Sequence, residues 1–286
     1  MKRLISLAAA GLMCGGVMLA VPGAAGAATS PPNAHTRVAQ PGGRIARAPG
    51  FSSSSPTISY NWSGYAATSK TPFNSVHSTF VQPSVKCPGI KYQWTSNWVG
   101  LDGYNDQTVE QDGTFAHCSG KSHTTPAYEA WIEMYPAPSI NAFPVKPGDI
   151  MDASVNYAGG TFTLTIADLT SGKSKTTAAT CASCKRASAE WIIERPALCS
   201  TSSCTSAFLT ELADYRTTTM SASTASVDGG AVKTVGRFHN VPIYMIDQLH
   251  QGFISLDTVA PLSGPSFTAT WDRHGNILPI SLGPDR

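Results

Sequence analysis

Hydrophobic and polar positions alternate along many short stretches of this chain. In SAEWIIERP, residues 188–196, Trp191 and Ile193 fall on one side, and Glu190 and Glu194 fall on the other. Successive side chains of a β-strand point to opposite faces. This stretch therefore predicts a strand with one apolar face and one face that carries carboxylates.

The same alternation predicts strands along most of the chain. Besides residues 188–194, the predicted strands are residues 58–66, 76–83, 92–101, 107–115, 126–135, 150–157, 161–168, 231–238, 253–257 and 266–272. The best helical candidate, residues 207–220, is short and rich in Thr. Many short strands without alternating helices are typical of a sandwich or barrel, and the Pro-rich turns favour the sandwich. We therefore predict an all-β fold, a sandwich rather than a barrel.

Two of these strands place aromatic and acidic residues together on one face. In SNWVGLDG, Trp98 and Asp102 lie opposite the aliphatic side chains, and in YEAWIEMYP, Glu133 and Tyr135 do the same. An ordinary solvent-facing side is rich in Lys, Thr and Ser, whereas aromatic residues beside carboxylates are typical of a binding surface. The pattern predicts a concave binding surface, and the alternative is a partly exposed face covered by loops.

The first 55 residues differ from the remainder. A basic start, a short apolar run and small residues predict a secretory signal peptide, residues 1–27, cleaved after Ala27. Residues 28–55 are rich in Pro, Gly and Ser and contain three Arg and no acid, so we expect a basic disordered leader or pro-segment. Residues 56–286 then form one large β-sandwich domain.

Charge separates the leader from the domain. The whole chain has a formal charge of +2, but its first 55 residues hold five basic residues and no acid, so the remainder carries about −3. A basic leader can bind over a carboxylate-lined cleft at neutral pH and be released when acid protonates it. No later stretch approaches the length of a transmembrane helix, so we expect an exported protein without a membrane partner.

The cysteines agree with export. Six Cys follow the predicted signal peptide, and an even number in a secreted chain is typical of disulfides. The short spacings favour the pairs Cys181–Cys184 and Cys199–Cys204, which leaves Cys87–Cys118, although other pairings stay open.

Several catalytic classes lack their motifs. The chain has no G-x-S-x-G, no H-E-x-x-H and no paired D-T-G or D-S-G. A cysteine nucleophile is not expected, because each mature Cys has a bridge partner. Carboxylates beside aromatic residues remain, and one familiar use of them is glycoside cleavage on a β-sandwich. The closely spaced acid cluster of those enzymes is missing.

Five motifs of the chain, taken together, resemble the glutamic peptidases, also called eqolisins. They are NWSGY (61–65), WVGLDG (98–103), QDGT (111–114), YEAWIEMYP (128–136) and AEWIIERP (189–196). The motifs stand in the family order and cover most of the chain from about residue 58 onward. The resemblance implies a sandwich of two large antiparallel sheets, similar to the concanavalin-like lectins. It also implies endopeptidase activity in acid by a Gln and Glu dyad, without metal or cofactor.

The resemblance also places the site residues. The dyad falls on Gln111, in QDGT, and on Glu190, in AEWI. Positions that line or support the family's cleft are occupied here by Trp98, Asp102, Glu133 and Tyr135, and we expect these to bind substrate. Fungal members tend to carry an acid at the place of Phe115 and an aromatic residue at that of Met134, and both departures lie outside the dyad.

The dyad suits peptide hydrolysis chemically. Glu190 can take a proton from water and return it to the departing amine, while the Gln111 amide donates to the developing oxyanion. We expect the two side chains to meet across neighbouring strands. Glu190 must be ionised to act as a base, and an ordinary Glu has a pKa of ~4.3. We predict activity in acid that falls toward neutrality for reasons outside Glu190, such as repulsion in the cleft or unfolding.

The sequence therefore predicts a secreted acid endopeptidase that acts on proteins or peptides as a monomer, with no nucleic-acid partner. A glycan-binding or glycan-cleaving sandwich is the alternative, and an inactive interaction domain of the same fold is a third possibility. Casein hydrolysis in acid that resists chelators and serine-directed reagents would distinguish the first from the other two.

Overall fold

The structure, a computed structural model, describes part of the chain. The described residues are 39–40, 45–48, 56–199, 206–249 and 252–280. They all belong to one compact unit, Arg37–Arg286. The predicted signal peptide and most of the predicted leader lie outside them. Within the described residues, no helix has both the length and the apolar character that crossing a membrane requires.

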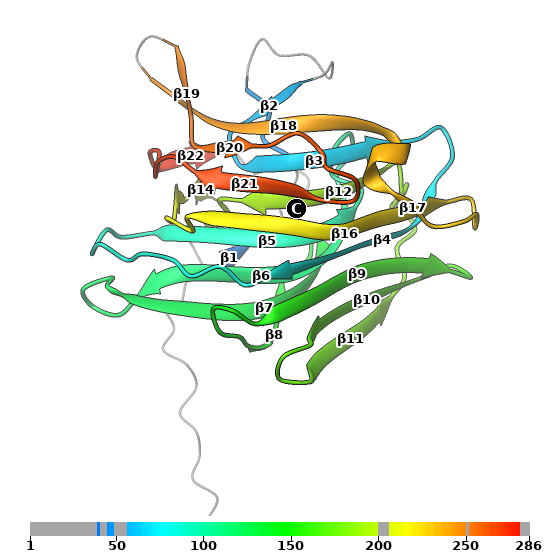
Figure 1. The fold of residues 1–286 in the computed structure, drawn as a ribbon, viewed down its shortest axis with the longest axis horizontal. Helices are drawn as coiled ribbons and strands as arrows, with labels where there is room; N and C mark the ends of the chain where they lie inside the picture. Colours follow the sequence, from blue (N-terminus) through cyan, green and yellow to red (C-terminus); the bar gives the residue numbers. More distant parts are fainter. Residues whose placement is uncertain (1–38, 41–44, 49–55, 200–205, 250–251, 281–286) are drawn as a thin grey trace, which may run out of the picture. The chain divides into compact units, whose positions relative to one another are not determined.

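The larger of two main sheets has ten strands (Figure 1). In spatial order they are β19 (Phe253–Ser255), β18 (His239–Gln248), β3 (Trp62–Thr68), β12 (Ser188–Glu194), β5 (Gln93–Leu101), β6 (Val109–Ser119), β7 (Thr125–Tyr135) and β8 (Ile140–Pro144), with β2 (Thr57–Ser59) beside β18 and β15 (Glu211–Leu212) beside β5. The pairings of β2 and β15 are parallel, and all other pairings in this sheet are antiparallel.

The second main sheet has eight strands, all antiparallel. In order they are β11 (Lys173–Ala179), β10 (Thr161–Asp168), β9 (Ile150–Ala158), β4 (Phe73–Val81), β16 (Thr217–Val227), β21 (Phe267–Trp271) and β20 (Asp257–Val259), with β17 (Lys233–Thr234) beside β16. A small third sheet contains β1 (Ala39–Gln40), β13 (Ala197–Cys199), β14 (Ala207–Leu209) and β22 (Leu278–Ile280). The described part has one short helix, the 3₁₀ turn η1 (Val235–Arg237).

The two main sheets form a sandwich because each has one continuous apolar face. In β10, TFTLTIAD, buried and partly exposed residues alternate strictly, as expected for a strand with one side in the core. Val99 and Ile132 of the ten-stranded sheet belong to the same buried cluster as Val155 and Leu164 of the eight-stranded sheet. The predicted all-β sandwich of two sheets is confirmed, and the small third sheet adds to it.

The predicted helix at residues 207–220 is wrong. This stretch contains β14, β15 and the start of β16 instead. The Thr residues that open β16 are β-branched and alternate between exposed and buried positions, so they suit a pleated sheet better than a helix. The strand predicted at 231–238 is reduced to β17 followed by η1, and the long strand here is β18.

Residues 45–48, which we call the strap, pack against the domain that we expected to begin at residue 56. The backbone N–H of Tyr60 donates to the carbonyl of Ala46 (2.7 Å), and that of Ala48 donates to the carbonyl of Ile58 (3.1 Å). Ile45 is buried as well. Part of the segment predicted as a disordered leader is therefore ordered on the domain.

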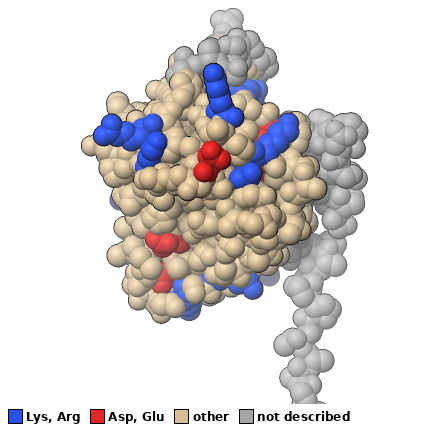
Figure 2. All heavy atoms as spheres, turned by 90° about the vertical axis from the view of Figure 1, so that its right-hand side faces the viewer, with Lys and Arg blue, Asp and Glu red and all other residues tan. Residues whose placement is uncertain are grey.

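Few charges lie on the surface. Figure 2 shows one side of the molecule, most of which carries neither Lys, Arg, Asp nor Glu. Only 13% of residues are charged, and more than half of the acidic side chains are buried. Acidic side chains are rarely buried unless they have a structural or chemical reason to be, so the buried ones are worth tracing individually.

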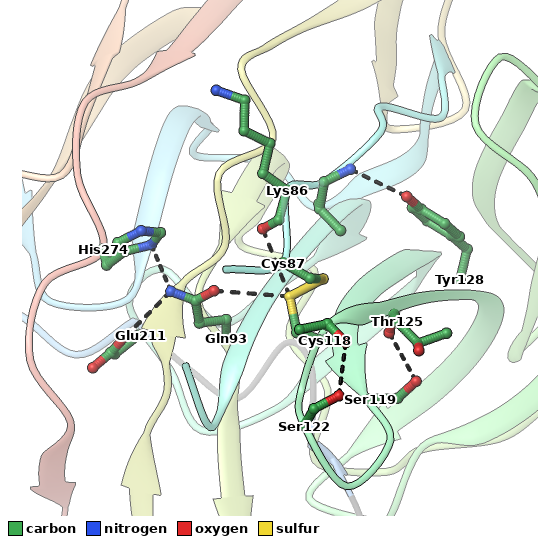
Figure 3. The surroundings of a disulfide bond; sticks show 12 residues. Lys86, Cys87, Gln93, Cys118, Ser119, Ser122, Thr125, Tyr128, Glu211 and His274 are labelled. Atoms are coloured by element: carbon green, nitrogen blue, oxygen red, sulfur yellow. Dashed lines mark hydrogen bonds between the residues drawn. A yellow bond between two sulfur atoms is a disulfide. The ribbon is translucent and has the colours of Figure 1, made fainter. Parts of the chain in front are cut away.

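Two of the expected disulfides are present, Cys87–Cys118 and Cys181–Cys184. Cys199 is also disulfide-bonded, and Cys204 lies outside the described residues. Figure 3 shows that the first bridge lies beside the buried Gln93, whose Nε2 is 2.9 Å from Nδ1 of His274. The bridge therefore ties the segment before β5 to the end of β6, two strands of the ten-stranded sheet.

Candidate active site

The face of the ten-stranded sheet that points away from the other sheet carries the predicted site, and we call it the site face. Neighbours in sequence alternate across the sheet: Val99 and Trp191 belong to the core between the sheets, whereas Trp98 and Ile192 belong to a second apolar cluster. The division predicted from the sequence for these strands is confirmed. Glu190 lies on the site face because it alternates with Trp191 along β12.

One row across the sheet contains both dyad residues. Glu190 of β12 pairs with Gly100 of β5, Gly100 pairs with Gln111 of β6, and Gln111 pairs with Glu133 of β7. Gln111 and Glu190 therefore lie on the same face but not on neighbouring strands, because β5 runs between them. Two strand spacings place their Cα atoms about 10 Å apart. Gly100 has no side chain, and the ring of Trp98 lies close to the position that a Cβ would occupy there.

The dyad side chains are fully buried. Gln111 and Glu190 are each 0% exposed, and Glu133 is 1% exposed. Nε2 of Gln111 donates a hydrogen bond to Oε2 of Glu133 (2.8 Å), which fixes the plane of the amide. The side chain of Ser188, on the same strand, hydrogen-bonds to the Glu190 carboxyl and offsets part of the effect of its burial. A peptide cannot reach Glu190 in this form of the chain without a rearrangement.

Asp102 is a structural anchor beside the row. It ends β5 in the left-handed region, with φ of 70°. Its carboxylate accepts three backbone hydrogen bonds, from the N–H of Lys185 (2.8 Å), Arg186 (2.6 Å) and Ala187 (2.6 Å). These residues lead directly into β12, so Asp102 fixes the start of the strand that carries Glu190.

The aromatic residues form the floor of the site face. Nε1 of Trp98 donates to Oε2 of Glu194 (2.8 Å), and Trp98 meets Trp62 edge to face, with ring centroids 4.9 Å apart. Tyr135 lies at the end of β7 in the same apolar cluster as both Trp residues. Ile45 of the strap joins this cluster too. The strap therefore packs on the same face as the dyad.

Buried acids near one end of the row shape its electrostatics. Burial raises the pKa of Glu190 well above its usual range, and the nearby Asp102, Asp106 and Glu110 raise it further. Burial likewise raises the pKa of Asp106 to about 7 and that of Glu110 to about 10, and Asp102 adds to both shifts. Burial and the neighbouring acids therefore favour the protonated form of Glu190 in this buried site.

Sequence reasoning missed several members of this neighbourhood. Glu194 could have been found, because it shares a strand face with Glu190. Asp106 and Glu110 carry no motif, and only their spatial closeness to Asp102 reveals them. Among the described residues, one group has the spacing of a metal site, Glu110 with Cys181 and Cys184. These two Cys are joined in a disulfide, so they offer no thiolate ligands.

Comparison with known families decides the identity. The model of the Peptidase A4 family matches residues 60–260. The chain belongs to this family, the glutamic peptidases. The match spans the whole row of site residues, from β3 to β12. This glutamic-type peptidase therefore acts on peptide bonds, and the family assignment favours that activity over a glycan-directed one.

Solved structures support the fold of the glutamic peptidase. Two structures of scytalido-glutamic peptidase with transition-state analogue inhibitors match with a TM-score of 0.63 and 21% identity, over 74% of this chain and 98% of theirs. The structure of SCP-B, an eqolisin in a complex with the tripeptide Ala-Ile-His, matches with a TM-score of 0.62 and 20% identity over the same shares. No curated protein matches the chain.

Proposed function

We propose that this glutamic peptidase is a secreted acid endopeptidase that hydrolyses peptide bonds with Gln111 and Glu190. The observation that carries the proposal is the row Glu190–Gly100–Gln111, which presents an acid and an amide on one face, with the ring of Trp98 close to the glycine between them. Once the site opens, a water molecule and a peptide carbonyl can bind between the two groups.

Glu190 acts on the water in this scheme. As a carboxylate it accepts a proton from water while the oxygen attacks the peptide carbonyl, and it then returns that proton to the departing amine nitrogen. The tetrahedral intermediate carries an oxyanion, which the amide of Gln111 stabilises by donating an N–H. Glu133 holds the Gln111 amide in a fixed orientation through the 2.8 Å hydrogen bond, so the donor is placed before the substrate arrives.

The raised pKa of Glu190 belongs to the buried form of the site. Glu190 must lose its proton to act as a base, and contact with solvent restores the pKa of a carboxyl toward ~4.3. The substrate cleft therefore has to open before Glu190 can work in acid. Its full burial fits a chain that still carries its leader as a pro-segment, of which the strap packs on the same face as the dyad.

Secretion and a monomeric state complete the proposal. The disulfides Cys87–Cys118 and Cys181–Cys184 suit an oxidising, extracellular setting. Trp98 and Tyr135 are expected to contact substrate side chains, whereas Asp102 acts by positioning β12 rather than by touching the substrate.

Two substitutions test the dyad. We expect Glu190→Gln to lower kcat for a casein peptide in acid by at least about 10³-fold, because the base is lost. We expect Gln111→Ala to lower it by about 10²-fold to 10³-fold, because one oxyanion donor is lost. The matched control is Glu129→Gln, a partly buried carboxyl on β7 of the same sheet, which should retain activity within about twofold.

Circular dichroism and thermal unfolding of each variant show whether it is folded. Full proteolysis by folded Glu190→Gln and Gln111→Ala would eliminate this mechanism. Activity that is lost equally in Glu129→Gln would show that the assay reports damage to the sheet rather than loss of the dyad.

A further inference from the structure

Strand β6 carries acidic residues on both sides of Gln111. Glu110 and Asp112 alternate with Gln111, so their side chains point away from the site face, into the space between the two sheets. Both are fully buried, at 0% exposed. Neither serves the proposed chemistry, and both lie directly beneath it.

Asp112 lies in an apolar row. Its partners on either side are Val99 of β5 and Ile132 of β7, which belong to the core between the sheets. From the opposite sheet, backbone groups of Thr165 on β10 and Ser154 on β9 hydrogen-bond to its carboxyl and offset part of the effect of burial. The charged group that acts on it there is another acid, Asp152.

Glu110 has a similar position one step along the strand. It pairs with Leu101 of β5 and Met134 of β7, and the side chains of Asp102 and Thr108 act on its carboxyl through hydrogen bonds. The nearby Asp102 and Asp106 raise the pKa of Glu110 by electrostatic repulsion, and Glu110 in turn raises the pKa of Glu190. All three of these neighbours are acidic.

A carboxylate in such a place is very costly. Burial removes its water and the neighbouring acids repel it, and these effects outweigh the hydrogen bonds that favour the charged form. A protonated carboxyl avoids the charge and fits the same space. The folded arrangement of β6 therefore requires protons on these two side chains.

We propose that Glu110 and Asp112 are positioning residues that hold β6, and with it Gln111, in place only while both carry protons. Their loss of protons sets the upper pH limit of activity. This effect originates on the core side of β6 and is independent of the titration of the dyad. This proposal rests on the proposed role of Gln111. It explains activity that is confined to acid although Gln111 itself does not titrate.

The sign of the effect follows from the direction of the pKa shifts. Burial raises the pKa of Glu110 to about 10 and raises that of Asp112 well above its usual range. In an unfolded chain both groups ionise near pH ~4. Their contribution to stability is complete below that pH and is lost progressively as the pH rises toward their folded pKa values.

The test compares Asp112→Asn and Glu110→Gln with the unaltered protein. Both amides keep the shape of the acid but never become charged. We expect the midpoint of the upper limb of the activity–pH profile to move up by about one pH unit or more, and the pH at which the protein unfolds at fixed temperature to move with it. The kcat in acid should stay within about threefold. Asp228→Asn, at an exposed turn, is the matched control and should move neither.

Unchanged upper limbs in folded Asp112→Asn and Glu110→Gln would overturn the proposal. If either variant fails to fold, infrared difference spectra of the unaltered protein at neutral pH provide the test. Protonated carboxyl absorption that is absent from the folded protein at neutral pH would also overturn it. The pH dependence of unfolding does not depend on catalysis, so it tests this proposal even if the proposed dyad is wrong. The activity of Gln111→Ala tests the dyad separately.

Discussion

At the scale of single residues, Gly100 defines the site as much as the dyad does. It occupies the position between Glu190 and Gln111 in the row, and its backbone needs no left-handed conformation. A Cβ placed there would lie 3.0 Å from the ring of Trp98 and 3.1 Å from Cβ of Gln111. Glycine is therefore required at this position because a larger residue would crowd Trp98 and Gln111.

We expect Gly100→Ala to lower kcat by about 10²-fold, because the added methyl group displaces the reacting groups from each other. The cost in stability should stay within about 1–3 kcal/mol, as for other tightly packed additions. Steady-state kinetics and urea unfolding measure the two effects. Gly236→Ala, in the exposed turn η1 with no atom nearer than 3.8 Å, is the control. A Gly100→Ala enzyme with normal kcat would show that the lack of a side chain at this position has no catalytic use.

At the scale of elements, His77 links three strands of the eight-stranded sheet. Its Nε2 lies 2.8 Å from Oδ2 of Asp152 on β9, and its Nδ1 lies 3.2 Å from the carbonyl of Ala222, in the β-bulge of β16. Both contacts are with acceptors, so both nitrogens must carry protons to satisfy them. The hydrogen bond to Asp152 is the main reason that the pKa of His77 is raised. The carbonyl of His77 also accepts the indole N–H of Trp191 (2.9 Å), beside Glu190.

Because the pKa of His77 is raised, its contribution to stability is complete below pH ~6.5 and is lost as the pH rises through the folded value. The His77–Asp152 ion pair is partly exposed, so we expect it to contribute no more than about 1 kcal/mol to the free energy of unfolding. Urea unfolding of Asp152→Asn at about pH 5 and pH 8 measures it: the variant should be destabilised at the lower pH and little changed at the higher. Equal destabilisation at both pH values would rule out a charged His77.

At the scale of the whole molecule, the strap packs on the same face as the dyad. Ala46 N–H donates to Oδ1 of Asn61 (2.7 Å), and Nη2 of Arg47 donates to the carbonyl of Tyr104 (2.6 Å). Arg47 also lies over the Tyr104 ring. These partners are a carbonyl and an aromatic ring rather than carboxylates. Acid alone therefore does not release this part of the leader, and we expect that activation requires a cut in the chain.

Loosening the strap should increase the activity of the uncut chain. Ile45→Ala removes a buried apolar side chain worth about 2 kcal/mol, so the open population should rise by about thirtyfold. The initial rate on a small peptide in acid, measured before any self-cleavage on a gel, reports this population. Ile140→Ala, at a side chain that is 57% exposed, is the control. An uncut chain as active as the cut one would contradict the inhibitory role of the leader.

Much of the fold was predictable from the sequence because it depends on local alternation. Strands such as β10 and β12 alternate apolar and polar residues with a period of two, and this pattern also assigned Val99 and Trp98 to opposite faces. The stretch 207–220 was not predictable in the same way, because its Thr-rich segment has weak local preference and is fixed by pairing with β4 and β21. The strap was misjudged because composition describes a segment alone, whereas its order comes from the domain beneath it.

The sequence by itself determined the family, the sandwich and the identity of the proposed dyad, since motifs and strand periodicity are properties of short stretches. Only the tertiary structure decided that β5 separates Gln111 from Glu190, that Gly100 lies between them in the row, and that Glu110 and Asp112 are buried on the other side of β6. Strand order and burial depend on which distant segments meet, and no local pattern records that. The charge state of an acid follows from burial, so the pH behaviour of this enzyme is a property of its packed structure.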